Sequence, residues 1–294
     1  YVYQTIYHRR KLFLEAPTGV GKTISTVFPS VKAIGEGMAE KIFYLTAKTI
    51  TRTVAQDCFK LLAEHGLAMK VLVITAKDKI CPMEETECNP DYCPYAKGHF
   101  DRINDAMYEL LQSENMFSRD IILECAGKHQ VCPFEMSLDM SLYADAIICD
   151  YNYVFDPNVY LKRFFAEGLG SKDYIFLIDE AHNLLERGRE MYSAALFKED
   201  FLKMKKLVKK ESSKLERQLE KCNKELLAMK RECVNYRRED MIAPFVMALT
   251  RAYATMDEFL EEHDSMPERS ELLDFYFDIA HFLNMYEIMD DNYV

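Results

Sequence analysis

The 294-residue sequence lacks long apolar runs, and none approaches the roughly 20 residues that a membrane-spanning helix requires. It also lacks the architecture of a secretory signal, because it opens with the letters Y-V-Y-Q-T-I-Y-H-R-R. These absences argue against a membrane partner and predict a cytoplasmic protein. An initiator methionine is missing as well, so we expect the chain to be a fragment of a longer protein.

Basic residues are outnumbered by acidic ones, which gives a net charge of −11. Over the whole chain this charge disfavours a nucleic-acid partner, although association depends on local patches rather than on the total. The nine cysteines occur without a secretion signal, so they are better interpreted as thiols or metal ligands in a reducing compartment than as disulfides. The length allows two domains with a sizeable core.

A phosphate-binding loop is predicted at residues 16–23, which read A-P-T-G-V-G-K-T. The apolar run L-F-L at 12–14 predicts a strand before it, and residues 23–33 predict a helix after it. A glycine-containing turn between a strand and a helix presents backbone N–H groups to an anion, and the helix N-terminus strengthens the attraction. We therefore expect ATP to bind through Ala16, Pro17, Thr18, Gly19, Val20, Gly21, Lys22 and Thr23.

The residues of this loop have distinct expected roles. Gly19 and Gly21 let the backbone curl close to the phosphates, and Lys22 would reach the β- and γ-phosphates. The Thr23 hydroxyl would ligate Mg²⁺. Ala16 stands where the general pattern has its first glycine, so it fits only if this position needs no positive φ.

A second motif lies at residues 174–184, which read Y-I-F-L-I-D-E-A-H-N-L. The apolar run predicts a buried parallel strand, and the carboxylates at its carboxyl end would lie beside the phosphate loop. Asp179 would hold the magnesium ion, and Glu180 would polarise the attacking water. His182 is either structural or links the nucleotide to a second site.

Further apolar segments predict strands at 41–46, 71–75 and 146–150, and residues 49–65 predict a helix. Strands that alternate with helices form right-handed βαβ units, so the fold class is α/β with a parallel sheet and helices on both faces. The alternation stops over residues 76–144, where something is inserted.

Five of the nine cysteines fall in this insertion. Cys81, Cys88 and Cys93 are separated by six and four residues, which does not match the C-x-x-C knuckles of structural zinc sites. Iron–sulfur clusters accept irregular spacings and a distant fourth cysteine, so a cluster is the first interpretation, with zinc and free thiols as alternatives. The fourth ligand is Cys125 or Cys132, and a following proline favours Cys132 because Cys81 and Cys93 share that feature.

The last third of the sequence predicts helices of opposite charge. Lys and Arg outnumber Asp and Glu over residues 198–238, whereas acidic residues dominate 257–291. Apolar residues recur at alternating four- and three-residue steps in the first stretch, which is typical of one arm of a helical hairpin. The basic arm either pairs with the acidic stretch or contacts nucleic acid.

The order of these features resembles the DinG and XPD family of iron–sulfur DNA helicases, DEAH-type motors of superfamily 2. The matching order is a phosphate loop, a four-cysteine insertion, and D-E-A-H-N-L followed by helices. Further matches are Y-L-T-A-K-T (44–49), C-P-F-E (132–135) and C-D-Y-N-Y-V-F-D-P (149–157). The resemblance covers residues 1 to about 190 well and the remainder only by position.

The resemblance implies four regions. A RecA-like motor domain 1 would occupy residues 1–75 and 145–192, an iron–sulfur domain 76–144, and an incomplete helical arch domain 193–294. A 4Fe–4S cluster would be held by Cys81, Cys88, Cys93 and Cys132.

The activity implied is ATP hydrolysis, with Mg²⁺ as cofactor, that drives 5′-to-3′ translocation on single-stranded DNA. Unwinding would occur at duplex–single-strand junctions, in DNA repair or replication-associated processing. The expected location is the bacterial cytoplasm or nucleoid.

The resemblance also implies DNA contacts. Thr46, Lys48 and Thr49 would meet the DNA backbone, a role that hydroxyls and a lysine at a strand end suit. Tyr151 and Tyr153 follow the strand at 146–150, where they either stack on bases or pack in the core.

Two departures from the family limit these expectations. The family's second motor domain, which supplies arginines to the ATP site, is absent from this sequence, and most of an upstream adenine-reading segment is missing apart from Gln4. We therefore expect the chain alone to bind nucleotide weakly and neither to unwind DNA nor to turn over ATP appreciably.

Two other functions compete with the helicase. One is an ATP-binding iron–sulfur protein in a redox or assembly role without DNA unwinding, and the other is a module whose basic helix docks a protein partner. The D-E-A-H letters favour the motor.

Overall fold

The computed structural model describes residues 1–294 apart from 18, 48, 85, 87, 167–172, 232, 240, 241, 264, 265, 292 and 294, and it leaves out the side chains of 49 and 50. The chain divides into two compact units, Tyr1–Arg187 and Gly188–Val294. Within the described residues, no helix combines the length and apolar character needed to cross a membrane.

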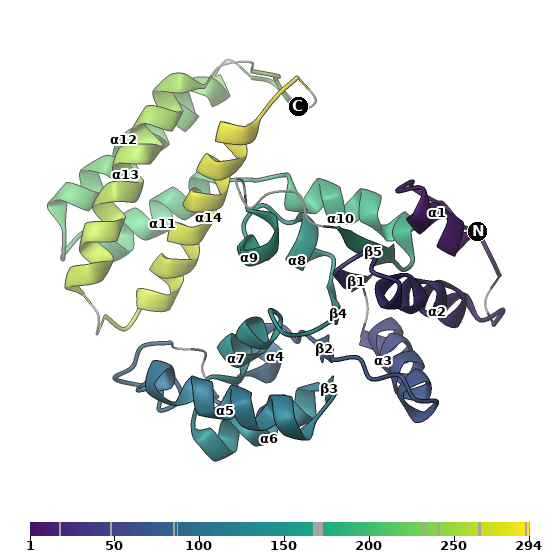
Figure 1. The fold of residues 1–294 in the computed structure, drawn as a ribbon. Helices are drawn as coiled ribbons and strands as arrows, with labels where there is room; N and C mark the ends of the chain where they lie inside the picture. Colours follow the sequence, from purple (N-terminus) through teal and green to yellow (C-terminus); the bar gives the residue numbers. More distant parts are fainter. Residues whose placement is uncertain are drawn as a thin grey trace. The chain divides into compact units, whose positions relative to one another are not determined.

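A five-stranded parallel sheet forms the centre of the first unit (Figure 1). Its strands are β1 (Lys41–Thr46), β2 (Val71–Val73), β3 (Met116–Phe117), β4 (Ala146–Asp150) and β5 (Tyr174–Ile178), in the order β3-β2-β4-β1-β5. Every residue of β1 is buried, as expected for a strand covered on both faces. The carboxyl ends of β1, β4 and β5 therefore meet at one edge, where the motif that follows β5 lies.

Helices cover both faces of this sheet. On one face, α2 (Lys22–Gly35) and α3 (Thr49–Glu64) contribute Val27 and Phe59 to a core that includes Ile42 and Tyr44 of β1. Phe43 points to the other face, because side chains alternate along a strand. There it packs against Phe164 and Phe165 of α9 (Lys162–Phe165) and Phe176 of β5, with 5.5 Å between the Phe43 and Phe176 ring centroids. The predicted α/β layering is confirmed.

Two predicted strands differ from the structure. Residues 12–14 form no strand, and Phe13 is 90% exposed; no strand of the described residues pairs with this run, so its apolar character alone does not make it extended. The strand before Asp179 does form, but it lies at the edge of the sheet, and Phe176 is 42% exposed rather than buried.

The insertion between β2 and β4 is largely helical. It contains α4 (Lys77–Ile80), α5 (His99–Ser113), α6 (Arg119–His129) and α7 (Pro133–Met140). The short strand β3 also comes from the insertion and extends the sheet beside β2. The inserted segment is thus joined to the sheet by backbone hydrogen bonds.

The remaining short helices of the first unit lie near its ends and around β4 and β5. They are α1 (Val2–Tyr7), α8 (Asn152–Phe155), the 3₁₀ turn η1 (Ala181–Asn183) and α10 (Leu184–Met191), which crosses the boundary between the units.

The second unit is built from four helices around one apolar core. They are α11 (Lys198–Val208), α12 (Ser213–Arg231), α13 (Ala243–Glu262) and α14 (Arg269–Ile288). The predicted stripe of α12 is confirmed, because Leu215, Leu219 and Cys222 are fully buried. In the same core the rings of Phe201 and Phe275 lie 4.9 Å apart.

Opposite charges pair across the helices of the second unit. Lys205 pairs with Glu220 at 2.7 Å, and Lys203 and Lys214 pair with Glu271 and Glu258. Charge complementarity therefore accounts for part of the basic arm, as one of the two interpretations of the sequence expected.

Candidate nucleotide-binding site

The predicted phosphate loop adopts a conformation that glycine favours at two positions. Gly19 has a φ of 82° and Gly21 a φ of 78°, both in the left-handed region. A Cβ at Gly19 would meet no atom within 4 Å, so open space surrounds this part of the loop. Ala16 is not among the described residues with positive φ, so alanine fits where the general pattern has glycine. Thr18 lies outside the described residues.

The loop opens directly into helix α2, whose first residue is Lys22. Gly21 is the N-cap and no side chain caps the helix, so the first N–H groups have no side-chain partner from the cap residue. A helix N-terminus of this kind attracts an anion through these N–H groups and the helix dipole. Pro17, Val20 and Thr23 complete the loop around it, and Val20 is exposed.

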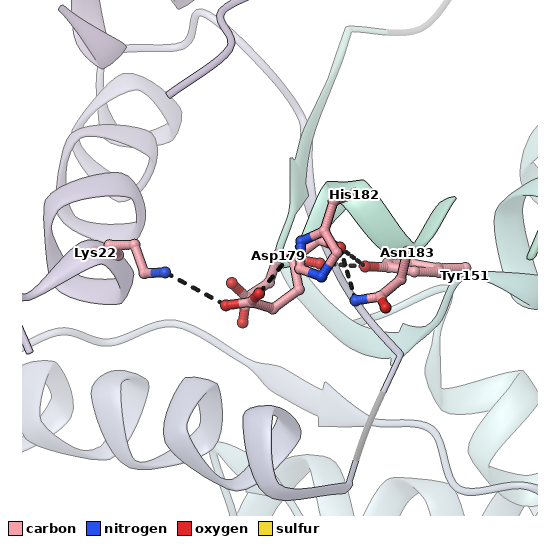
Figure 2. Close-up of polar contacts among 6 residues, drawn as sticks. Lys22, Tyr151, Asp179, His182 and Asn183 are labelled. Atoms are coloured by element: carbon pink, nitrogen blue, oxygen red, sulfur yellow. Dashed lines mark hydrogen bonds and ion pairs between the residues drawn. The ribbon is translucent and has the colours of Figure 1, made fainter. Parts of the chain in front are cut away.

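The two carboxylates after β5 face this loop. Lys22 Nζ lies 3.3 Å from Glu180 Oε1, and His182 Nδ1 lies 3.5 Å from Glu180 Oε2 (Figure 2). The structure therefore brings together the lysine and the carboxylate that the sequence assigned to phosphate binding and water activation. His182 itself is 72% exposed, so it is accessible to a second partner.

Tyr44, which the sequence reasoning missed, lies beside the two candidate magnesium ligands. Burial first, and then the charge of Asp179, raises the pKa of Tyr44, whereas the Thr23 side chain lowers it. The phenol is therefore neutral. Because Tyr44 lies in the buried strand β1, it offers Thr23 and Asp179 a fixed neighbour.

Glu180 has a backbone conformation that is unusual for its residue type. Its φ of 51° and ψ of 44° are left-handed, which costs a non-glycine residue about 1–2 kcal/mol. The Tyr151 hydroxyl donates to the Asp179 carbonyl and lies 3.1 Å from the Glu180 carbonyl. Asn183 Nδ2 also donates to the Glu180 carbonyl, at 3.1 Å (Figure 2).

The residues expected to contact DNA are mostly inaccessible. Thr46 and Tyr151 are fully buried, and Tyr153 is 7% exposed. Stacking of Tyr151 or Tyr153 on bases is therefore wrong for this structure, because their ring faces pack inside the protein, and Thr46 is likewise covered. Lys48 and the side chain of Thr49 lie outside the described residues.

The predicted cluster ligands are only partly gathered. Cys88 acts on the pKa of Cys132, and both thiols act on the pKa of Lys77, so these three groups lie near one another. Within the described residues, which exclude Glu85 and Glu87, no three His, Cys, Asp or Glu side chains converge on a point that could hold a metal ion. The cluster on Cys81, Cys88, Cys93 and Cys132 stays a prediction.

The surroundings of Cys132 suit a thiolate better than those of Cys125. Cys132 is the N-cap of α7, and the backbone N–H groups of Phe134 and Glu135 oppose the rise in its pKa that burial causes. Its own N–H donates to Nδ1 of the buried His99 at 3.1 Å. Cys125 is instead buried on α6 with Sγ 3.5 Å from the Ala106 carbonyl, and burial raises its pKa. The donor chemistry therefore fits Cys132 as the fourth ligand.

Comparison with known proteins gives a family match and distant relatives. The family model DEAD_2 matches residues 62–201. Over 215 residues the chain is 24% identical to a Regulator of telomere elongation helicase 1 homolog from Caenorhabditis elegans. This match covers 58% of the chain and 21% of that protein. Over 197 residues it is 23% identical to the General transcription and DNA repair factor IIH helicase subunit XPD of Dictyostelium discoideum, covering 58% of the chain and 25% of that protein.

Solved structures share the fold. A truncated XPD superposes with a TM-score of 0.60 at 18% identity, covering 98% of this chain and 80% of that one. A second structure, an XPD helicase, gives a TM-score of 0.59 at 19% identity. This match covers 98% of the present chain and 49% of the helicase chain. The parallel sheet is thus RecA-like, as the sequence predicted. The chain spans about a fifth to a quarter of the length of the relatives named above.

Proposed function

We propose, from the premise that the chain belongs to the N-terminal part of the XPD/DinG-type family of superfamily 2 helicases, that it forms the ATP-binding half of a DNA helicase motor. The contact between Lys22 and Glu180, at 3.3 Å, carries this proposal. It joins a glycine loop at a helix N-terminus to a pair of carboxylates, the combination that nucleoside triphosphate hydrolysis requires.

The roles of the site residues follow from their positions. The open loop at Gly19 and Gly21 would hold the phosphates with its N–H groups. Lys22 would leave Glu180 for the β- and γ-phosphates, which frees the Glu180 carboxylate to orient the attacking water. Thr23 and Asp179, which both act on the pKa of Tyr44, would hold the Mg²⁺ ion.

DNA enters the proposal through the family. The printed names of the relatives describe helicases and a DNA repair factor subunit, which supports single-stranded DNA as the partner and DNA repair or replication-associated processing as the context. We infer 5′-to-3′ movement and unwinding at duplex–single-strand junctions from the resemblance. Lys48 and Thr49 follow the carboxyl end of β1 in sequence and are the DNA-backbone contacts that we retain. The exposed His182 would couple this path to Glu180.

A 4Fe–4S cluster is proposed for the insertion. Cys81, Cys88, Cys93 and Cys132 would hold it, and Lys77 together with the N–H groups of Phe134 and Glu135 would stabilise the thiolates. The cluster would act mainly as a structural staple, because metal ligation supplies folding free energy to the stretch 81–98, where Cys93 is the only described residue that is buried.

The test is ATP hydrolysis by the whole protein with and without single-stranded DNA, combined with strand separation on duplexes that carry 5′ or 3′ overhangs. We expect stimulation by DNA, unwinding from the 5′ overhang only, and loss of both activities in Glu180→Gln. Glu64→Gln, an exposed carboxylate at the end of α3, is the control and should behave like the parent. ATP hydrolysis that single-stranded DNA does not stimulate would favour a redox or assembly role instead.

A further inference from the structure

Tyr151 occupies a position from which one side chain reaches the backbone of both motif carboxylates. It follows β4 directly, whereas Asp179 and Glu180 follow β5, and β1 lies between those strands. Neighbouring strands are about 4.8 Å apart, so the side chain reaches over the end of β1 toward a strand roughly 10 Å away. A long side chain with a polar tip is needed to cover that span.

The contacts of the Tyr151 hydroxyl are with backbone atoms and not with the carboxylates themselves. It donates to the Asp179 carbonyl and lies 3.1 Å from the Glu180 carbonyl (Figure 2). The ring is fully buried, and the two hydrogen bonds are partly buried. Burial and the nearby Asp179, Asp150 and Glu180 charges raise the pKa of Tyr151 to about 12, and the hydroxyl keeps its proton at neutral pH.

Tyr151 is itself anchored on both sides. Arg187 Nη2 lies 3.4 Å from Asp150 Oδ1 and donates to Asn152 Oδ1 at 3.0 Å. The Asn152 N–H donates to Asp150 Oδ1 at 3.0 Å and closes the turn. The turn that carries Tyr151 is therefore held in place, which is what a residue that fixes another segment requires.

We propose that Tyr151 is a positioning residue that holds the Asp179–Glu180 backbone, and with it the left-handed conformation of Glu180, in the geometry needed for hydrolysis. The inference rests on the proposed ATPase function and adds a residue to it. The left-handed conformation persists only where the surroundings impose it. The described side-chain hydrogen bonds to the Glu180 carbonyl come from Tyr151 and Asn183, beside a backbone one from the Asn183 N–H. Without the hydroxyl, the Glu180 carboxylate would lose its fixed direction toward the attacking water.

The experiment compares Tyr151→Phe with the parent in the whole protein, measuring kcat and KM for DNA-stimulated ATP hydrolysis. Because the Lys22 and Thr23 contacts to nucleotide remain, we expect kcat to fall about tenfold or more while KM changes by less than about twofold. Asn183→Ala removes the other side-chain hydrogen bond to the same carbonyl, while the Asn183 N–H keeps its own at 2.9 Å, and it should lower kcat in the same direction. Tyr174→Phe, which removes a hydroxyl from the opposite end of β5, should leave both constants unchanged.

Hydrogen exchange of the amides at residues 179–183 is the second readout, and it does not depend on ATPase activity. We expect faster exchange there in Tyr151→Phe and not in Tyr174→Phe. An unchanged kcat with unchanged exchange would overturn the inference, as would an equal loss of kcat in Tyr174→Phe. If the parent hydrolyses no ATP, the proposed function fails, and unchanged exchange in Tyr151→Phe would then overturn the positioning role separately.

Discussion

Gly19 and Glu180 both have left-handed backbone at the candidate site, for different reasons. Glycine adopts this conformation without a steric penalty, and the space around Gly19 is open. Glu180 carries the penalty of a Cβ and is held by hydrogen bonds from Tyr151 and Asn183 to its backbone. The backbone of the predicted phosphate loop is therefore set by its glycines, whereas that of Glu180 is held by neighbouring side chains.

Alanine should have opposite effects at Gly19 and Gly127, because both glycines have space for a Cβ and only Gly19 has a left-handed backbone. Gly19→Ala places a Cβ on a residue whose φ is 82°. The strain should destabilise this loop conformation by about 1 kcal/mol and so weaken nucleotide binding. Gly127→Ala, inside α6 and also without a neighbour within 4 Å, should stabilise the fold by about 0.5–1 kcal/mol. Urea unfolding and nucleotide titration of both variants check the pair, and a stabilising Gly19→Ala would contradict it.

Single residues of the site divide into those that the sequence identifies and those that it does not. Lys22, Asp179 and Glu180 stand in recognisable motifs, and the structure brings Lys22 to Glu180. Tyr44 and Tyr151 belong to strands or turns far away in sequence, so their contacts depend on strand order. Nothing in a strand's own letters reveals that order. For the same reason the sequence left open whether Tyr151 stacks on bases or packs in the core, and the structure buries it.

At the scale of helices and strands, the spacing of apolar residues predicted those elements whose formation depends on local packing. The helix after the phosphate loop, the buried strand β1 and the stripe of α12 follow directly from apolar spacing. The run at 12–14 did not form a strand because a strand needs a partner, and Phe13 is exposed. The two-residue strand β3 could not have been found, since its pairing with β2 is set by the helices around it.

The helix α7 carries a test of the cysteine ligands at its N-terminus. We expect Cys132→Ser to lose bound iron and acid-labile sulfide from anaerobically purified protein, because it removes one of the four thiolates proposed to hold the cluster. Cys125→Ser is the control, since its thiol is buried against Ala106. About four irons and four sulfides per chain, kept in the control, are expected for a cluster held by four thiolates. Stoichiometric zinc without sulfide, or a loss confined to Cys125→Ser, would contradict the assignment.

Considered as a whole molecule, the chain combines two units with separate apolar cores. The first contains the sheet, the phosphate loop and the carboxylates, and the second is a helical unit whose charges are paired internally at several points. The α/β class with a parallel sheet followed from the alternation of strands and helices. Activity on DNA did not follow from it, because that activity is inferred from relatives several times longer than these residues.

The measurement that tests the central claim most directly is calorimetric titration of the 294-residue chain with Mg–ADP, comparing the parent, Lys22→Ala and Lys32→Ala. Lys22 begins α2 beside the phosphate loop, whereas Lys32 lies in the same helix with its side chain 55% exposed. We predict weak but measurable binding to the parent, a loss of about tenfold or more in Lys22→Ala because a charge-assisted phosphate contact disappears, and no change in Lys32→Ala. Binding that survives Lys22→Ala unchanged, or no binding to the parent, would contradict the account.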